Sequence, residues 1–378
     1  MNANPQNLSQ THLMDNDAPE SKDPSPVEDF RNFLEAHRDQ RHAVVMQDCP
    51  DPDAISSALA HAMIAAKYNI QSDLVYLGEV SHPENLALIR VLEIDLLRWT
   101  PDFQAKDYDG AIFVDNQAVN TTLWPKLEEA GVKPIGIVDH HTRQAAPAVE
   151  FSDIRLVGAT ATLYTQYIKD GLMPLESGHR PHARLATALM HGIRTDTTNL
   201  VNAREEDFSA AAYLSRFSNS SLLNEILSVK RTPRVMEGIE KALSTRRQVN
   251  HLTLAGIGFL RRRDRDIIPQ VADFLLTEED VHTVVVYGVV MNEDGSESIV
   301  GSLRSSKLTL SPDEFLKEAL GVDEGGNHYG GGRRNAGGFE IPLGFMSGSY
   351  DEDYDQLKWK LVERKIQQVI LGKMGSKE

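Results

Sequence analysis

Residues 43–54 read AVVMQDCPDPDA, and this stretch decides the fold that we expect for the first half of the chain. The apolar run Ala43–Met46 is typical of a short strand buried on both faces. It stops at a polar turn that carries Asp51 and Asp53, and a helix rich in small residues is expected over Ala54–Tyr68. A strand, a turn and a helix in direct succession form the unit from which parallel sheets are built.

The same alternation continues along the chain. Further apolar runs occur at Leu74–Leu77, Ala111–Val114 and Ile135–Val138, and two more helices are expected over Gly158–Lys169 and His182–Ile193. Short apolar strands that alternate with helices predict an α/β fold. We therefore expect a mostly parallel, Rossmann-like sheet with helices on both faces.

The length of 378 residues exceeds what a single core usually holds, so two domains are expected. A second region rich in strands begins near Leu252, and a glycine-dense loop is expected over Gly325–Gly338. The expected divisions are a disordered tail over 1–26, a first α/β domain over 27–204, a helical linker over 205–250, a smaller mixed α/β domain over 251–345 and a C-terminal helix over 346–378.

Composition and charge exclude several classes of protein. The chain carries 39 Lys and Arg against 55 Asp and Glu, a formal net charge of −16, which opposes binding to long nucleic acid. It lacks a run of about 18 apolar residues, so neither a membrane span nor a membrane partner is expected. Its start lacks the pattern of a signal peptide, and its single cysteine, Cys49, allows no intrachain disulfide. We therefore expect a cytoplasmic location.

Acidic and imidazole side chains follow the predicted strands at the same end. They are Asp51 and Asp53 after the first strand, Asp115 after Ala111–Val114, and Asp139, His140 and His141 after Ile135–Val138, with Asp196 just beyond the helix that ends at Ile193. In an open parallel sheet the carboxyl ends of the strands meet at one edge, where ligands bind. Carboxylates gathered there cannot all stay ionised without cations, and a shell of Asp and His without sulfur suits Mn²⁺ or a similar ion.

A simpler interpretation exists for each residue taken alone. A single Asp after a strand is more often a turn or cap residue, and Asp51 or Asp53 could merely cap the helix at Ala54. The glycine-dense segment could be a plain flexible loop. The shared position of all these groups at the strand ends favours the metal site.

Six motifs in this order give the chain a resemblance to a known family. They are PDPDA at 50–54, FVDN at 113–116, VDHH at 138–141, GIRTDT at 192–197, SLRSS at 302–306 and GGGRRNAGG at 330–338. The first four resemble the DHH phosphoesterases, and the last two look like the substrate-binding elements of the accompanying DHHA1 domain. The resemblance covers roughly Val27 to Leu343. It implies a DHH domain, a helical linker and a smaller mixed DHHA1 domain.

The resemblance also implies a pair of divalent ions, with Mn²⁺ as the expected metal. Asp115 would bridge the two ions, with Asp51 on one side and, on the other, Asp53, His140 and Asp196. The catalytic candidates are Asp139, which would orient an imidazole, and His141, which would point at the phosphate. Implied substrate-binding residues are Arg304, Ser305, Gly330, Gly331, Gly332 and Arg333, because glycine lets backbone N–H groups approach an anion closely.

Two residues depart from the family pattern. Gln47 stands where many members have a metal-binding His, and it is a further candidate ligand, although its amide oxygen is weaker than imidazole. The first metal position would then be looser, completed by water, or served by another histidine: His42, His61 or His82. Arg333 stands where many members have His, and its guanidinium suits phosphate or the Hoogsteen edge of guanine.

The motif set looks most like the stand-alone nanoRNase and dinucleotide phosphodiesterase branch. We therefore expect a Mn²⁺-dependent phosphoric diester hydrolase that cleaves linear dinucleotides or very short oligoribonucleotides, with pGpG favoured, to 5′-mononucleotides. The alternatives are a 3′-phosphoadenosine 5′-phosphate phosphatase, a cyclic-dinucleotide phosphodiesterase and a nucleotide sensor without turnover. The expected partner is a small nucleotide, not long nucleic acid. The family further implies a homodimer, which no feature of the sequence requires.

Overall fold

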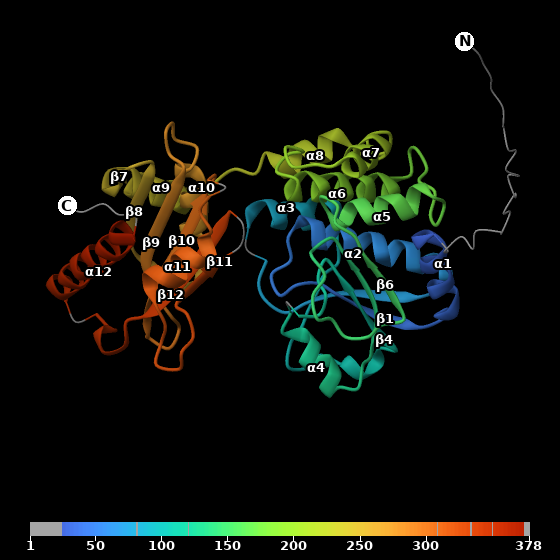
Figure 1. Cartoon of the computed structure of the whole chain (residues 1–378), viewed down its shortest axis with the longest axis horizontal. Helices are drawn as coiled ribbons and strands as arrows, with labels where there is room; N and C mark the ends of the chain where they lie inside the picture. Colours follow the sequence, from blue (N-terminus) through green and yellow to red (C-terminus); the bar gives the residue numbers. More distant parts are fainter. Residues whose placement is uncertain are drawn as a thin grey trace, which may run out of the picture. The chain divides into compact units, whose positions relative to one another are not determined.

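The computed structural model describes residues 25–80, 82–119, 121–307, 309–332, 335–349 and 351–373. The chain divides into two compact units, and unit 1 extends to Ser228 apart from residues 81–83, while the main part of unit 2 begins at Val229 (Figure 1). Residues 1–24 of the expected tail lie outside the described part, and Pro26 already begins helix α1. The boundary at Ser228 falls within the expected linker, whose residues divide between the two units.

Unit 1 contains a six-stranded sheet in the order β3-β2-β1-β4-β5-β6, and every neighbouring pair is parallel. The strands are β1 Arg41–Val45, β2 Gln71–Tyr76, β3 Leu97–Arg98, β4 Gly110–Val114, β5 Pro134–Asp139 and β6 Phe151–Ile154. This arrangement confirms the predicted Rossmann-like fold. The sequence had not indicated β3 or β6, because β3 is only two residues long and β6 alternates buried and more accessible positions.

Helices cover both faces of this sheet (Figure 1). The helices of unit 1 are α1 Pro26–Ala36, α2 Pro52–Ala65, α3 Pro83–Leu92, α4 Leu123–Glu129, α5 Thr160–Lys169, α6 Arg180–Asp196, α7 Glu205–Leu214 and α8 Ser220–Leu227, with short 3₁₀ turns at Ala66–Tyr68 and Ala105–Asp107. Of these, α7 and α8 pack against α5 and α6. The prediction that α6 ends at Ile193 was wrong. Asp196 is its last residue, so this acidic side chain belongs to a rigid helix rather than to the following loop.

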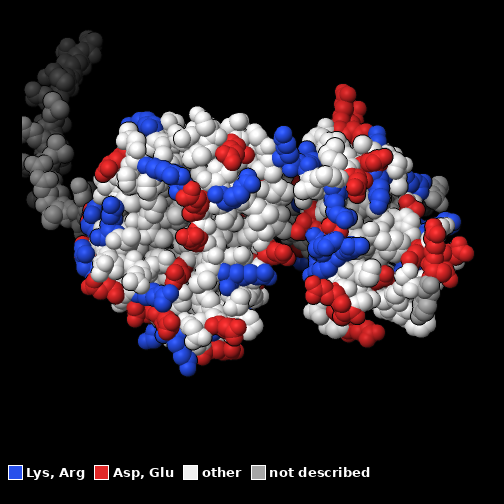
Figure 2. All heavy atoms as spheres, turned by 180° about the vertical axis from the view of Figure 1, so that it is seen from behind, with Lys and Arg blue, Asp and Glu red and all other residues white. Residues whose placement is uncertain are grey.

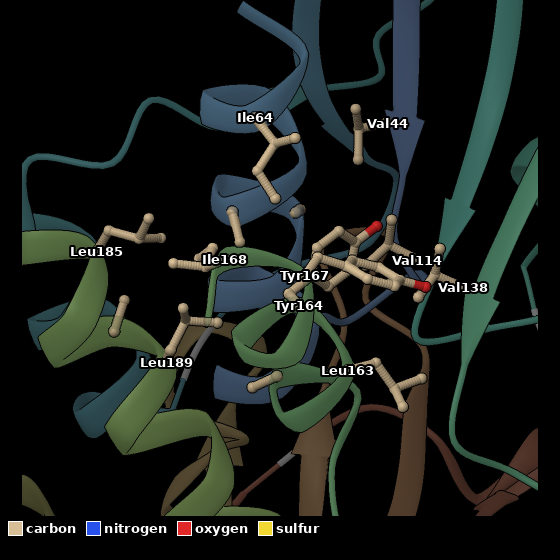
Figure 3. Packing of buried hydrophobic residues seen from close by; sticks show 14 of the residues in the cluster. Val44, Ile64, Val114, Val138, Leu163, Tyr164, Tyr167, Ile168, Leu185 and Leu189 are labelled. Carbon is tan, nitrogen blue, oxygen red and sulfur yellow. The ribbon is translucent and has the colours of Figure 1, made fainter. Parts of the chain in front are cut away.

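A dense apolar layer fixes the sheet against α2, α5 and α6. Val44, Val114 and Val138 project from neighbouring strands toward these helices, and the rings of Tyr164 and Tyr167 fill the space between them (Figure 3). All five side chains are fully buried. Because such a close-packed layer resists displacement, the carboxyl ends of β1, β4 and β5 stay in fixed positions.

Unit 2 contains a second six-stranded sheet in the order β11-β12-β10-β9-β8-β7, with β8 and β9 parallel and the other pairs antiparallel. Its strands are β7 Arg247–Val249, β8 Leu252–Arg261, β9 Thr283–Met291, β10 Glu297–Ser305, β11 Gly330–Gly332 and β12 Ala336–Pro342. Its helices are α9 Pro233–Thr245, α10 Ile267–Leu275, α11 Pro312–Leu320 and α12 Glu352–Lys373, with 3₁₀ turns at Arg262–Asp264 and Gly344–Met346. The mixed sheet confirms the second α/β region.

The glycine-dense segment forms strands β11 and β12, so the prediction of a loop over Gly325–Gly338 was wrong for most of its second half. Close packing accounts for some of these glycines. A Cβ atom at Gly337 would lie 2.7 Å from Cδ1 of Leu316 on helix α11, a distance shorter than van der Waals contact allows. Among the described residues, no helix combines the length and apolar character needed to cross a membrane.

Candidate metal centre

The carboxyl ends of β1, β4 and β5 form one edge of the parallel sheet. The strand order reverses between β1 and β4, and a reversal of this kind is where ligands bind in open α/β sheets. The segment after β1 carries Asp53, Asp115 directly follows β4, and His140 follows β5. The last residue of α6, Asp196, reaches the same place.

Four of the predicted ligands converge there. Nε2 of His140 lies 3.9 Å from an Asp53 oxygen, 3.5 Å from an Asp115 oxygen and 3.2 Å from an Asp196 oxygen. These separations match the spacing of neighbouring ligands around one divalent ion, whose bonds to such groups are about 2.0–2.2 Å long. The cluster therefore has the chemistry and the spacing of a cation site.

Helix α5 positions two of these carboxylates. The backbone N–H groups of Thr160 and Ala161 donate hydrogen bonds to the two oxygens of Asp53, with N···O distances of 2.7 and 2.8 Å. The Thr160 hydroxyl donates to Asp115 over 2.9 Å. Asp115 itself has a positive φ of 59°, an uncommon conformation that often marks functional residues. The sequence analysis missed Thr160, since a threonine at a helix start gives no specific signal.

The histidine is oriented by a backbone carbonyl. Nδ1 of His140 donates to the carbonyl oxygen of Val157 over 3.1 Å, which leaves Nε2 directed at the carboxylates. Metal-binding histidines commonly have their second nitrogen fixed in this way. Within the described part of the chain, Nε2 is buried and makes no hydrogen bond of normal geometry, as expected for an atom placed to bind an ion.

The charges of the cluster are not balanced by the protein. Burial and the neighbouring carboxylates raise the pKa of Asp53 to about 8 and that of Asp115 well above its ordinary value. Burial lowers the pKa of His140, but the Asp196 and Asp53 carboxylates outweigh this effect and raise it to about 9. No described Lys or Arg forms an ion pair with the three carboxylates. A divalent cation would supply the missing positive charge.

A second set of contacts orients His141. Its Nδ1 donates to Asp139 over 2.8 Å, and the amide nitrogen of Gln117 donates to the other oxygen of Asp139 over 2.7 Å. Burial alone would raise the pKa of Asp139, but these hydrogen bonds keep it below its ordinary value. With Nδ1 engaged, the half-exposed His141 ring presents Nε2 to a ligand. Nothing in the sequence pattern had indicated Gln117.

A family model matches the part of the chain that carries most of this cluster. Residues 42–193 match the family model described as "DHH family, N-terminal domain". This segment therefore carries a DHH-family N-terminal domain. Asp53, Asp115, Asp139, His140 and His141 all lie within the matched DHH segment.

One curated relative and two solved structures are similar to most of this chain. An uncharacterized protein of Methanocaldococcus jannaschii is 35% identical over 332 residues, which are 87% of this chain and 63% of that protein. The chain thus spans 63% of the length of this curated relative. The crystal structure of an exopolyphosphatase-related protein from Bacteroides fragilis shares the fold, with a TM-score of 0.64, 15% identity and coverage of 91% and 97% of the two chains. A pGpG-specific phosphodiesterase, PggH, from Vibrio cholerae aligns at a TM-score of 0.33 and 14% identity over 86% and 98% of the chains.

The other candidate ligands of the DHH domain have different surroundings. Asp51 caps helix α2, since one oxygen accepts the Ala54 N–H over 3.0 Å and the other accepts the amide N–H of Gln47 over 2.9 Å. Of the alternative histidines, His42 contacts Gln40 and His61 contacts Tyr164. Both histidines lie in the core, where burial lowers their pKa values to about 4 and about 3.

The substrate-binding candidates of unit 2 are bonded within that unit. Nε of Arg304 donates to Asp273 over 2.6 Å, and the Ser305 hydroxyl lies buried against Thr283. Gly330, Gly331 and Gly332 form strand β11, and the Gly332 N–H donates to Asp313 over 3.0 Å. Arg333 lies outside the described residues. The described contacts of these residues therefore lie within unit 2.

Proposed function

We propose that this chain is a divalent-metal-dependent phosphodiesterase that hydrolyses linear dinucleotides and very short oligoribonucleotides, with pGpG favoured, to 5′-mononucleotides. The observation that carries the proposal is the convergence of Asp53, Asp115, His140 and Asp196 at the edge of a DHH-family domain. Mn²⁺ is the ion that we expect there, because the donor set combines carboxylates with one imidazole.

The chain's own residues have defined parts in this reaction. A divalent ion, when bound, polarises a phosphate oxygen and lowers the pKa of a bound water. Asp139 accepts the Nδ1–H of His141 and so holds the ring in place, and in the protonated ring Nε2–H can donate a hydrogen bond to a phosphate oxygen as charge develops on it. The α5 N–H groups hold the Asp53 carboxylate in place, which removes the need for reorganisation during the reaction.

Charge supports a short substrate. The net charge of −16 opposes the many phosphate contacts that a long strand requires. On the face drawn in Figure 2, Lys and Arg side chains are interspersed with Asp and Glu over both units. A dinucleotide carries few phosphates, so local contacts at the metal centre suffice to offset this repulsion.

Product analysis tests the proposal. Metal-stripped protein is reloaded with Mn²⁺ or Mg²⁺ and incubated separately with pGpG, pApA, a 7-mer RNA, 3′-phosphoadenosine 5′-phosphate and a cyclic dinucleotide. We expect the two linear dinucleotides to yield mononucleotides fastest, and Asp115→Asn to reduce turnover to that of the metal-stripped protein. Faster cleavage of the 7-mer would refute the length preference. Release of free phosphate from 3′-phosphoadenosine 5′-phosphate without dinucleotide cleavage would favour a phosphomonoesterase.

A further inference from the structure

Asp51 and Asp53 stand two residues apart, but their carboxylates have different surroundings. Asp53 is fully buried and lies 3.9 Å from His140 Nε2. Among the described residues, two groups of three side chains place their ligand atoms within 4.8 Å of one another, and Asp51 belongs to neither group. The groups are Asp53 with His140 and Asp196, and Asp115 with His140 and His141.

The second of these groups does not define a separate metal position. It shares His140 with the first group, and Nδ1 of this histidine is already bonded to Val157, so Nε2 is the one nitrogen available for an ion. Nδ1 of His141 is likewise bonded to Asp139. The two groups therefore describe one preformed cation position, around which Asp53, Asp115 and Asp196 face His140 Nε2.

Gln47 holds Asp51 in a hydrogen bond. Its side chain is buried, and its terminal nitrogen lies 2.9 Å from Oδ2 of Asp51. An ionised carboxylate only accepts hydrogen bonds, so the amide must present its N–H group here. An amide nitrogen does not bind hard divalent ions, which take oxygen ligands or imidazole nitrogen. For both residues to bind an ion, the amide would have to turn and give up a hydrogen bond to a charged group.

We propose that the chain by itself binds one divalent ion tightly, at Asp53, Asp115, His140 and Asp196, and that Gln47 weakens a second position by engaging Asp51. Oδ1 of Asp51 is bonded to the α2 backbone, so ion binding there competes with hydrogen bonds at both of its oxygens. A histidine at position 47 would offer a nitrogen lone pair in place of the N–H donor. The inference rests on the proposed function for the nature of the ion and goes beyond it in the number of ions bound.

Metal counting tests this inference without an activity measurement. Metal-stripped protein is dialysed against increasing Mn²⁺, bound metal is counted per chain, and the electron paramagnetic resonance spectrum of the bound ion is recorded. We expect the wild type to bind one ion with the six-line spectrum of isolated Mn²⁺. We expect Gln47→His to bind two, with the second ion held about tenfold or more tighter than in the wild type and a spectrum broadened by coupling between the ions.

The outcomes separate this inference from the proposed function. Two ions bound by the wild type with similar affinity would overturn the inference alone. If the Gln47→His variant kept the circular dichroism spectrum of the wild type and bound only one ion, that result would also overturn the inference alone. A wild type that binds no Mn²⁺ would overturn the proposed function as well. The wild-type stoichiometry needs no substitution, so the test does not depend on whether the variant folds.

Discussion

The Thr160 hydroxyl donates a hydrogen bond to Asp115, with 2.9 Å between the two oxygens, and the Thr160 backbone N–H donates to Asp53. One residue at the start of α5 thus positions two carboxylates that come from separate strand ends. Because a metal centre requires its ligands at fixed separations, we expect this residue to affect ion binding although it is not itself a ligand.

Thr160→Val tests this role, because it removes the hydroxyl and retains the shape and the backbone N–H group. We expect Mn²⁺ affinity to fall about tenfold to hundredfold, the range found when groups that orient metal ligands are removed. Thr160→Ser keeps the hydroxyl and serves as the matched control. Calorimetric titration with Mn²⁺ gives the affinities, and equal values for the valine and serine variants would contradict the assignment.

Gln117 should influence turnover without influencing ion binding. Its amide nitrogen donates to Asp139, which in turn holds His141, and neither contact includes Asp53 or Asp196. We expect Gln117→Ala to lower kcat about tenfold to hundredfold, because the imidazole loses its fixed orientation. Gln104→Ala, at an exposed glutamine of the same unit, is the control. A parallel loss of Mn²⁺ affinity would show that the residue acts on the metal centre instead.

The strands that carry the site were predictable from local sequence. β1, β4 and β5 are buried on both faces, so they read as apolar runs, and their ends place the acidic residues together. β6 was missed because its buried and accessible positions alternate and because its buried Asp153, which pairs with Arg155, breaks the apolar pattern. Such a pair becomes visible only once the chain is folded.

The supporting residues of the site were not predictable. Thr160 reaches Asp115 across 45 positions of sequence, and Gln117 reaches Asp139 across 22. A single hydroxyl or amide carries no local signal for a contact of this kind. The strand at Gly330–Gly332 was missed for a related reason: glycine is depleted in strands, and its presence here follows from close packing against α11.

His61 should make the stability of unit 1 depend on pH. Burial lowers its pKa from 6.5 to about 3, so the folded chain keeps it neutral while the unfolded chain protonates it as pH falls below 6.5. The free energy of unfolding therefore falls on acidification, by about 1.4 kcal/mol per pH unit near pH 5 for this group. Its contribution is fully present above pH 6.5 and is lost as the pH falls toward 3.

Urea unfolding between pH 4 and 7 measures this effect. In a Trp359→Phe background the remaining tryptophans, Trp99 and Trp124, both lie in unit 1, so their fluorescence reports on that unit. The slope of the unfolding free energy against pH gives the number of protons taken up on unfolding. We expect His61→Gln to lower this number by about one proton near pH 5. A loss of stability that is the same at every pH would not change the slope of the unfolding free energy against pH. An unchanged slope would show that His61 titrates in the folded state.

Gly192 sets the separation between α2 and α6, which carry Asp53 and Asp196. A Cβ atom at this position would lie 2.4 Å from the Ser56 hydroxyl, 3.1 Å from Asp53 Cα and 3.2 Å from the Pro52 carbonyl oxygen. The hydroxyl can rotate away, but the two backbone atoms belong to the α2 segment that carries Asp53. Gly192→Ala should therefore move the helices apart and separate the two carboxylates.

We expect Gly192→Ala to destabilise unit 1 by about 1–3 kcal/mol, the usual cost of overpacking, and to weaken Mn²⁺ binding. Adding Ser56→Ala removes the shortest contact and should restore part of the stability, but little of the ion affinity, because the backbone contacts remain. Gly372→Ala is the control, since it adds the same methyl group to α12 with no atom within 4 Å. If the double variant recovered full Mn²⁺ affinity, the side-chain contact would account for the loss, and the helix separation would not control the metal centre.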